Sequence, residues 1–331
     1  MPDHRVLIIG LSIAHRAATR ASGEEMRGRR ARWYILGNRD MELCAPPHPT
    51  TRQPTFRAPA LACDCHAHIL GPDARYPYVA DRSFTPPDAL EDAYLRMLGT
   101  LGIERMVIVQ ASVYGTDNRR LTAAIEALGR ARARGVAMVG VDVTPASLRD
   151  LDARGVRATR FITTARGGPG LDGLQEVARK VAPFGWHIEM YVPPAIWPAL
   201  LPVIDTLPVP VVFDHLAAMR AGVDPDDPIL LDILRKLESG RHWVKLCGYR
   251  ASVAGYPYAD VAPLAALFIR HAPERCVWGT DWPHTNVVGP MPDDGELFDL
   301  LAEWAPDAVV RERILVRNPA KLYRFQDERL A

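Results

Sequence analysis

Short apolar runs alternate with amphipathic segments along the chain from residue 61 onward. Most of these runs are nearly continuous in Val, Ile and Leu, which is typical of parallel strands covered on both faces. We expect strands at 61–67, 105–111, 136–143, 156–163, 186–192, 209–214, 243–247 and 276–280. Between them apolar residues recur at helical spacing, as in Leu90, Tyr94, Met97, Leu98 and Leu101. The alternation predicts βαβ units in an α/β protein.

Eight such units are the number that closes a (β/α)8 TIM barrel. The competing fold is a doubly wound open sheet, which usually carries a glycine-rich phosphate loop after its first strand. In this chain that place is taken by His66-Ala67-His68. The pattern therefore favours a TIM barrel over residues 61–331.

The first 60 residues differ in composition from the rest of the chain. They hold ten Lys and Arg residues against five Asp and Glu, whereas residues 61–331 hold thirty against thirty-four. Arginines gather at 27–32, and prolines interrupt the polar stretch 46–59. We expect an N-terminal extension over 1–60 that is disordered, or a start assigned too early with Met41 as the true start. A targeting or interaction tail is the alternative.

Composition narrows the kind of partner. The mildly acidic body gives no reason to expect nucleic acid, and no apolar run is long enough to span a membrane. The five cysteines are odd in number and scattered, so they imply no disulfide framework. We expect a cytoplasmic protein, and the sequence predicts no oligomeric state.

Histidines occupy the end of the first predicted strand. Side chains alternate along a strand, so we expect Asp64, His66 and His68 on one face. The same alternation puts Cys63 and Cys65 on the opposite face, where we interpret them as buried packing. The two imidazoles should then converge at the mouth of the barrel.

Two more polar residues follow later strands. His215 comes after the run 209–214, and Asp281 comes after the run 276–280. Taken singly, a histidine at a strand end is more often structural, and an aspartate there is often a helix cap. A barrel, however, places catalytic groups at the carboxyl ends of its strands. Together with His66 and His68, these residues predict one shared site.

Three motifs carry a resemblance to a known family. They are Asp64-Cys65-His66-Ala67-His68, Phe213-Asp214-His215, and Gly279-Thr280-Asp281-Trp282-Pro283-His284. They are similar to motifs of the amidohydrolase superfamily, and within it to the branch of 2-pyrone-4,6-dicarboxylate lactonases and related sugar-lactone and muconolactone enzymes. The resemblance covers residues 61–325. It implies a hydrolase that opens the lactone ring of a small di- or tricarboxylate, with Asp281 activating water and His66, His68 and His215 polarising the carbonyl group.

The resemblance also implies a set of substrate contacts. Guanidinium groups bind carboxylates in bidentate fashion, which would suit an anionic lactone, although arginines at these places can equally be surface charge. The residues that match substrate-binding positions of the lactonase are Arg160, Arg166, Arg250, Ser112 and Tyr191, and we add His284 beside Asp281.

A metal and other activities stay open at this point. His66, His68, His215 and Asp281 would suffice for one zinc ion, but the lactonase branch implies a site that works without a metal, which we favour. The alternatives are a sugar-diacid lactone isomerase, a muconolactone hydrolase, a mononuclear zinc hydrolase or decarboxylase, and a binding barrel without activity. The expected partner in most of them is a small anionic lactone.

Overall fold

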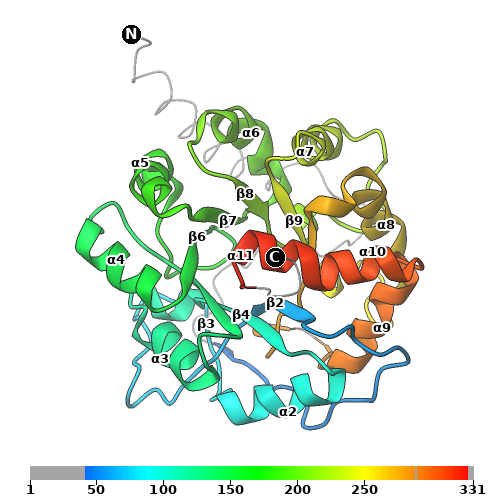
Figure 1. Cartoon of the computed structure of the whole chain (residues 1–331), viewed down its shortest axis with the longest axis horizontal. Helices are drawn as coiled ribbons and strands as arrows, with labels where there is room; N and C mark the ends of the chain where they lie inside the picture. Colours follow the sequence, from blue (N-terminus) through cyan, green and yellow to red (C-terminus); the bar gives the residue numbers. More distant parts are fainter. Residues whose placement is uncertain (1–41, 288, 327–331) are drawn as a thin grey trace, which may run out of the picture.

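The computed structural model describes residues 42–287 and 289–326, and its centre is an eight-stranded parallel barrel (Figure 1). Each strand pairs with the next along the chain. The strands are β2 Cys63–Ala67, β4 Arg105–Val109, β5 Ala133–Ala137, β6 Val156–Ile162, β7 His187–Tyr191, β8 Val211–Phe213, β9 Trp243–Leu246 and β10 Cys276–Trp278. All eight predicted strands are present, so the predicted TIM barrel is confirmed. A separate parallel pair joins β1 Glu42–Leu43 to β3 Phe84–Thr85.

The barrel closes between β10 and β2 at their carboxyl ends. The Asp281 N–H donates to the His66 carbonyl at 2.8 Å, and the His68 N–H donates to the Trp282 carbonyl at 2.8 Å. Gly279 sits at this seam, where a Cβ would lie 2.7 Å from the Cβ of His66. The seam therefore requires a glycine, and it brings two predicted site residues together through their own backbones.

Helices cover the outside of the barrel (Figure 1). In α2 the predicted apolar face is correct, because Tyr94, Met97, Leu98 and Leu101 are buried, while Leu90 precedes the helix and is exposed. Among the described residues, no helix is long and apolar enough to cross a membrane. The helices are α2 Glu91–Leu101, α3 Arg119–Leu128, α4 Pro145–Ala153, α5 Leu174–Val181, α6 Trp197–Thr206, α7 Pro228–Glu238, α8 Ala262–His271 and α9 Asp294–Trp304.

The C-terminal segment closes the amino end of the barrel: α11 Asn318–Tyr323 lies over the centre of the barrel, and α10 Ala308–Glu312 leads to it from the rim (Figure 1). The Arg134 guanidinium on β5 donates to the carbonyls of Tyr323 and Arg324 at 3.2 and 3.1 Å. The strand predicted at 136–143 was wrong in its bounds, because β5 runs from Ala133 to Ala137. The real strand begins three residues earlier, since its polar start is satisfied by a segment that is distant in sequence.

Part of the predicted extension lies on the barrel. Residues 1–41 fall outside the described residues, whereas the Phe56 ring stacks on Phe298 of α9 with a centroid distance of 4.4 Å. The Thr55 hydroxyl and backbone N–H both donate to the Asp299 carboxylate. The domain boundary at residue 60 stays a prediction, but residues 52–56 are tied to α9.

Candidate active site

A β-bulge in β2 changes the predicted direction of its side chains. Asp64 pairs with Met106 of β4, but Ala67 pairs with Ile108, so β2 carries one extra residue between these pairs. Asp64 consequently points outward and accepts a hydrogen bond from the Tyr94 hydroxyl of α2 at 2.9 Å. The prediction that Asp64 shares a face with His66 was wrong, because strict alternation fails at a bulge.

The same bulge places the two cysteines of β2 inside the barrel. Cys63 and Cys65 are fully buried in a cluster that draws on most of the strands and the C-terminal segment. Their interpretation as buried packing is confirmed, although the face is the interior one. The extra residue then lets His66 turn inward directly after Cys65, so the two neighbours share one side of the strand.

Asp64 holds the bulge and the seam. One of its oxygens accepts the backbone N–H groups of His66 and Thr280, each at 3.0 Å. The other accepts the Thr280 hydroxyl at 2.7 Å and the Tyr94 hydroxyl. Burial raises the pKa of Asp64 to about 6, although these hydrogen bonds oppose the rise. Asp64 thus has a structural role beneath the site.

The four predicted core residues lie together at the carboxyl ends of β2, β8 and β10. Asp281 Oδ1 is 3.7 Å from His66 Nε2 and 3.6 Å from His68 Nε2. The His66 and His215 rings are 4.7 Å apart between centroids. All four side chains are buried. One carboxylate therefore faces two imidazoles, with a third imidazole beside them.

The backbone at two of these residues is strained. His215 begins a turn of four residues, through Ala218, with φ between 50° and 58°, and Asp281 has φ of 69°. A left-handed conformation costs a residue with a side chain about 1–2 kcal/mol. The Trp197 indole N–H supports this turn by donating to the Ala217 carbonyl at 2.8 Å. Strained backbone conformations are concentrated at functional sites, so the strain at His215 and Asp281 is consistent with the functional site predicted there.

Asp281 is held as a carboxylate by its neighbours. The Tyr249 hydroxyl donates to Oδ2 at 2.7 Å, and the Arg250 guanidinium contacts the same oxygen. Burial raises the pKa of Asp281, but the positive charge of Arg250 is the largest effect against it, and together with the other neighbours it holds this pKa well below its ordinary value. Tyr249 was not predicted, because a tyrosine after a strand has no distinctive sequence signal.

Two of the three predicted arginines reach this group. Arg160 on β6 is buried, and its Nε donates to Asp214 Oδ2 at 2.9 Å, while its Nη2 lies 3.5 Å from His215 Nε2. Arg250 contacts Asp281 as described. Arg166 is exposed, and its guanidinium lies 3.3 Å from Asp81 and donates to the Arg82 carbonyl. The structure does not bring Arg166 into the cluster.

The other predicted contacts lie at or just after the carboxyl ends of β4, β7 and β10. The Tyr191 ring packs edge-on against His215 at 4.5 Å. Ser112 is buried after β4, and its carbonyl would lie 2.2 Å from a Cβ on Gly167, so the loop that carries Arg166 passes close over it. His284 Nε2 lies 3.0 Å from Asp294 of α9, which ties that ring to the outer helix.

A buried lysine below the histidines was missed by the sequence reasoning. Lys245 on β9 is fully buried, with Nζ 2.5 Å from Glu189 Oε2, 3.3 Å from Asp214 Oδ1 and 3.2 Å from His66 Nδ1. Burial lowers the pKa of Lys245, but Asp214 and Glu189 raise it by more. A charged residue at an inward position of an apolar strand was the available signal.

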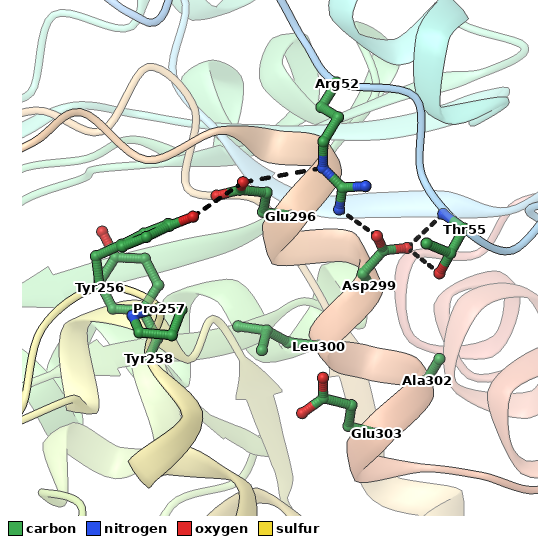
Figure 2. A pocket seen from close by; sticks show the side chains of 10 residues that line it. All are labelled: Arg52, Thr55, Tyr256, Pro257, Tyr258, Glu296, Asp299, Leu300, Ala302 and Glu303. Atoms are coloured by element: carbon green, nitrogen blue, oxygen red, sulfur yellow. Dashed lines mark hydrogen bonds and ion pairs between the residues drawn. The ribbon is translucent and has the colours of Figure 1, made fainter.

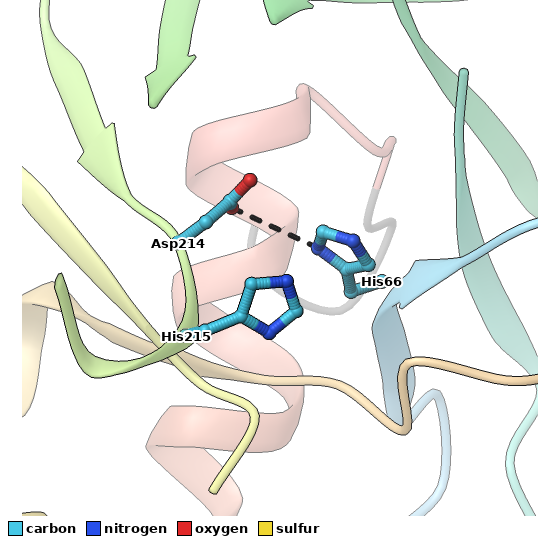
Figure 3. A group of neighbouring side chains, drawn as sticks. All are labelled: His66, Asp214 and His215. Atoms are coloured by element: carbon cyan, nitrogen blue, oxygen red, sulfur yellow. Dashed lines mark ion pairs between the residues drawn. The ribbon is translucent and has the colours of Figure 1, made fainter. Parts of the chain in front are cut away.

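A resident zinc ion does not fit these residues. Two groups bring ligand atoms within 4.8 Å of one another: His66, Asp214 and His215, and His66, His68 and Asp281. The first group converges as Figure 3 shows, but the Lys245 ammonium already lies beside its His66 and Asp214 atoms. In the second, Lys245 donates a hydrogen bond to His66 Nδ1, so a neutral ring carries its proton on Nε2, and that nitrogen would have to lose the proton before it could bind a metal.

A second pocket lies beside α9, and none of the predicted site residues lines it (Figure 2). Its Asp299 carboxylate is already bonded to Arg52 and Thr55, and Glu296 accepts the Tyr256 hydroxyl at 3.2 Å. These pairs fasten residues 52–55 to the helix. The pocket therefore has a sufficient explanation in the packing of the N-terminal segment.

Comparison with known proteins agrees with this geometry. A family model described as amidohydrolase matches residues 63–325. The chain is 37% identical over 285 residues to a 2-pyrone-4,6-dicarboxylate hydrolase of Comamonas testosteroni, covering 82% of this chain and 92% of the relative. It is 38% identical over 289 residues to a 4-sulfomuconolactone hydrolase of Rhizobium radiobacter, covering 85% and 95%.

A third relative and a solved structure extend the comparison. The chain is 31% identical over 281 residues to a D-galactarolactone isomerase of Agrobacterium fabrum, covering 83% of this chain and 94% of the relative. A probable 2-pyrone-4,6-dicarboxylic acid hydrolase of Acinetobacter baumannii, solved with citric acid bound, superposes with a TM-score of 0.68 at 25% identity. That match covers 80% of this chain and all of the solved one.

Proposed function

The chain belongs to the amidohydrolase family, and we propose that it hydrolyses the lactone ring of a small di- or tricarboxylate, with 2-pyrone-4,6-dicarboxylate as the first candidate. One observation carries the proposal: Asp281 has one oxygen tied to Tyr249 and Arg250, and the other facing His66 and His68. Its free oxygen is thus available to a reactant. The relatives that share this barrel are named for lactones.

Asp281 is the proposed general base. A water molecule between Asp281 Oδ1 and His68 Nε2, which are 3.6 Å apart, could donate one hydrogen to each. His68 Nε2 is free to accept, because its Nδ1 lies 2.8 Å from the Val109 carbonyl and must carry the ring proton there. As Asp281 takes the proton, the water oxygen attacks the lactone carbonyl carbon.

Negative charge then develops on the carbonyl oxygen and needs donors. His66 Nε2 and His215 Nδ1 are buried nitrogens without a hydrogen-bond partner among the described residues, and we assign them this stabilisation. The ring C–O bond breaks, and its oxygen leaves with a proton returned from the Asp281 side. The product is a ring-opened chain with a new carboxylate and a new hydroxyl group.

The substrate carboxylates are assigned to guanidinium groups at the mouth. Arg160 and Arg250 lie beside the cluster, and each is now paired with an aspartate that a substrate carboxylate could replace as partner. We also assign substrate contacts to the remaining predicted residues, Arg166, Ser112, Tyr191 and His284. For Arg166 this requires its side chain to leave Asp81 and turn toward the site.

The reaction is proposed to need no metal, since Lys245 and Arg250 already supply cationic charge beside the carboxylates. The activity would belong to the breakdown of aromatic compounds. A cytoplasmic location is proposed as well, supported by five cysteines of which none is in a disulfide.

The test is hydrolysis of 2-pyrone-4,6-dicarboxylate by the purified protein, followed by loss of the pyrone absorbance with and without a chelator. We expect turnover that the chelator leaves unchanged. Asp281→Asn should lower kcat about 1,000-fold, since a general base contributes about 10²–10⁴-fold, yet still bind the substrate in a calorimetric titration. Full activity of this variant would exclude Asp281 as the base.

A lactone isomerase is the second candidate, because one relative carries that name. The two reactions differ in the fate of water. Hydrolysis in ¹⁸O-labelled water places one labelled oxygen in the product carboxylate, whereas migration of a lactone bond within the molecule places none. Galactarolactone and 4-sulfomuconolactone, assayed beside the pyrone, would show which ring the site prefers.

A further inference from the structure

Lys245 is a buried charged group to which the proposed reaction gives no contact with the substrate. Its Nζ has three hydrogens and three partners, namely Glu189, Asp214 and His66, at 2.5, 3.3 and 3.2 Å. An ammonium group has hydrogens to donate and no lone pair. With two carboxylates beside it, Lys245 is charged, so the contact with His66 requires the lysine as donor and the imidazole Nδ1 as acceptor.

This contact determines where His66 carries its proton. Burial, with the positive charges of Lys245 and Arg160, lowers the pKa of His66 well below its ordinary value, so the ring is neutral and has a single N–H. Because Nδ1 accepts from Lys245, the N–H is at Nε2. That nitrogen is buried, lies 3.7 Å from Asp281 Oδ1, and has no hydrogen-bond partner among the described residues.

The lysine is itself held from several sides. Glu189 Oε1 accepts the Tyr323 hydroxyl at 2.8 Å and lies 3.5 Å from His187 Nε2. Asp214 Oδ2 accepts from Arg160 Nε at 2.9 Å. Each carboxylate therefore contacts Lys245 through one oxygen, while its other oxygen is bonded to Tyr323 or Arg160. Because both carboxylates are held in place, the Lys245 ammonium group is held in place as well.

We propose that Lys245 is a positioning residue that fixes His66 in its Nε2–H tautomer and thereby makes this imidazole a hydrogen-bond donor to the lactone carbonyl oxygen. In a zinc site, the second nitrogen of a ligating histidine usually donates to a carboxylate or a carbonyl. Here it faces a cationic donor, which is the opposite arrangement. The role of His66 as a donor to the lactone rests on the proposed lactone hydrolysis, whereas the assignment of its tautomer to Lys245 does not.

The tautomer is measured without substrate in protein labelled with [¹⁵N]histidine. The His66 signals are identified by their loss in His66→Gln. We expect the wild-type protein to show a protonated Nε2 and an unprotonated Nδ1. A second sample, Lys245→Met/Glu189→Gln, removes the ammonium and one buried carboxylate charge together, and should lose this preference. Glu189→Gln alone keeps Lys245 and is the matched control, which should retain the Nε2–H form.

Zinc affinity and activity give independent readouts. The double variant should bind zinc about tenfold or more tightly than the wild-type protein, since partners of a ligating histidine change metal affinity by about 10–100-fold.

The lactonase assay tests the donor role of His66 with two variants. The amide N–H of His66→Gln reaches toward the Nε2 position, and that of His66→Asn does not. His66→Gln should therefore retain about tenfold more kcat than His66→Asn, because an oxyanion donor contributes about 100-fold or more.

The outcomes separate this inference from the proposed function. A wild-type Nδ1–H signal, or a double variant with an unchanged tautomer, would overturn the role of Lys245, and the wild-type spectrum decides even if the variant does not fold. His66→Asn equal to His66→Gln would overturn the donor role. The expected tautomer in a protein that opens no lactone would refute the proposed function and leave the positioning by Lys245 intact.

Discussion

At the scale of single residues, Asp281 illustrates how a base can be both buried and ionised. Its Oδ2 has two donors, Tyr249 and Arg250, while Oδ1 is left to face the imidazoles. A carboxylate held this firmly is a weak base. A substrate carboxylate that engages Arg250 would take away part of this stabilisation, so binding would strengthen the base at the moment it is needed.

Tyr249→Phe tests that balance through pH. The hydroxyl stabilises only the charged form of Asp281, so its loss should raise the pKa of this residue. Asp281 works as the carboxylate, and the acid limb of kcat/KM should therefore move toward neutral pH, by about one pH unit for one lost hydrogen bond to a charge. The control is Tyr256→Phe, an exposed tyrosine bonded to Glu296. An unmoved acid limb in Tyr249→Phe would contradict the assignment.

Arg166→Met tests the one predicted arginine that lies outside the cluster. Its ion pair with Asp81 is exposed, so the free energy of unfolding should change by less than about 1 kcal/mol. If Arg166 turns inward to bind a substrate carboxylate, KM should rise about tenfold or more with kcat nearly unchanged. Asp81→Asn breaks the same ion pair and keeps the arginine. Equal KM in both variants and the wild-type protein would remove Arg166 from the site.

At the scale of elements, the bulge in β2 brings His66 into the barrel and sends Asp64 outward. Asp64→Asn should fold, because the amide oxygen can still accept the N–H groups of His66 and Thr280. The amide NH₂ would face the hydroxyls of Tyr94 and Thr280, which can rotate to accept. The variant thus keeps the hydrogen bonds of the seam and removes only the charge.

The charge of Asp64 should make the free energy of unfolding depend on pH. The pKa of Asp64 is raised from 3.8 to about 6 in the fold, so its contribution is fully present below pH 3.8 and is lost as pH rises through about 6. The wild-type protein should therefore gain up to about 3 kcal/mol over Asp64→Asn as pH falls from 7 to 4. Urea unfolding of both proteins across this range measures the difference. Parallel curves would mean that the carboxyl group does not change its charge there.

Elements also show how far the sequence could be interpreted. Apolar runs located all eight strands, since their signal lies within a few neighbouring residues, whereas strict alternation gave the wrong face for Asp64 in β2. The bulge in β2 and the early start of β5 depend on partners such as Tyr94 and Tyr323, which are distant in sequence. Lys245 was missed for the same reason: its position in the strand is visible in the sequence, but its three partners come from β7, β2 and the residue that follows β8.

At the scale of the whole molecule, the two ends of the barrel are connected through its interior. The C-terminal segment closes the amino end, and Tyr323 donates from there to Glu189 at 2.8 Å. Glu189 holds Lys245, and Lys245 donates to His66 at the opposite end. A continuous series of hydrogen bonds thus passes through the barrel, from the segment that covers its base to the imidazole of the site.

Tyr323→Phe interrupts this series at its base without creating a cavity. Among the described residues Glu189 Oε1 would keep only His187, whose Nε2 is 3.5 Å away, so a buried carboxylate loses its best donor there. The free energy of unfolding should fall by about 1–3 kcal/mol in urea titrations, whereas exposed Tyr256→Phe should change it by less than about 0.5 kcal/mol. Because Lys245 keeps its ion pair with Asp214 and its hydrogen bond to His66, the His66 tautomer should persist. If Tyr323→Phe is as stable as Tyr256→Phe, the C-terminal segment closes the barrel by apolar packing alone, and the link from base to site carries no free energy.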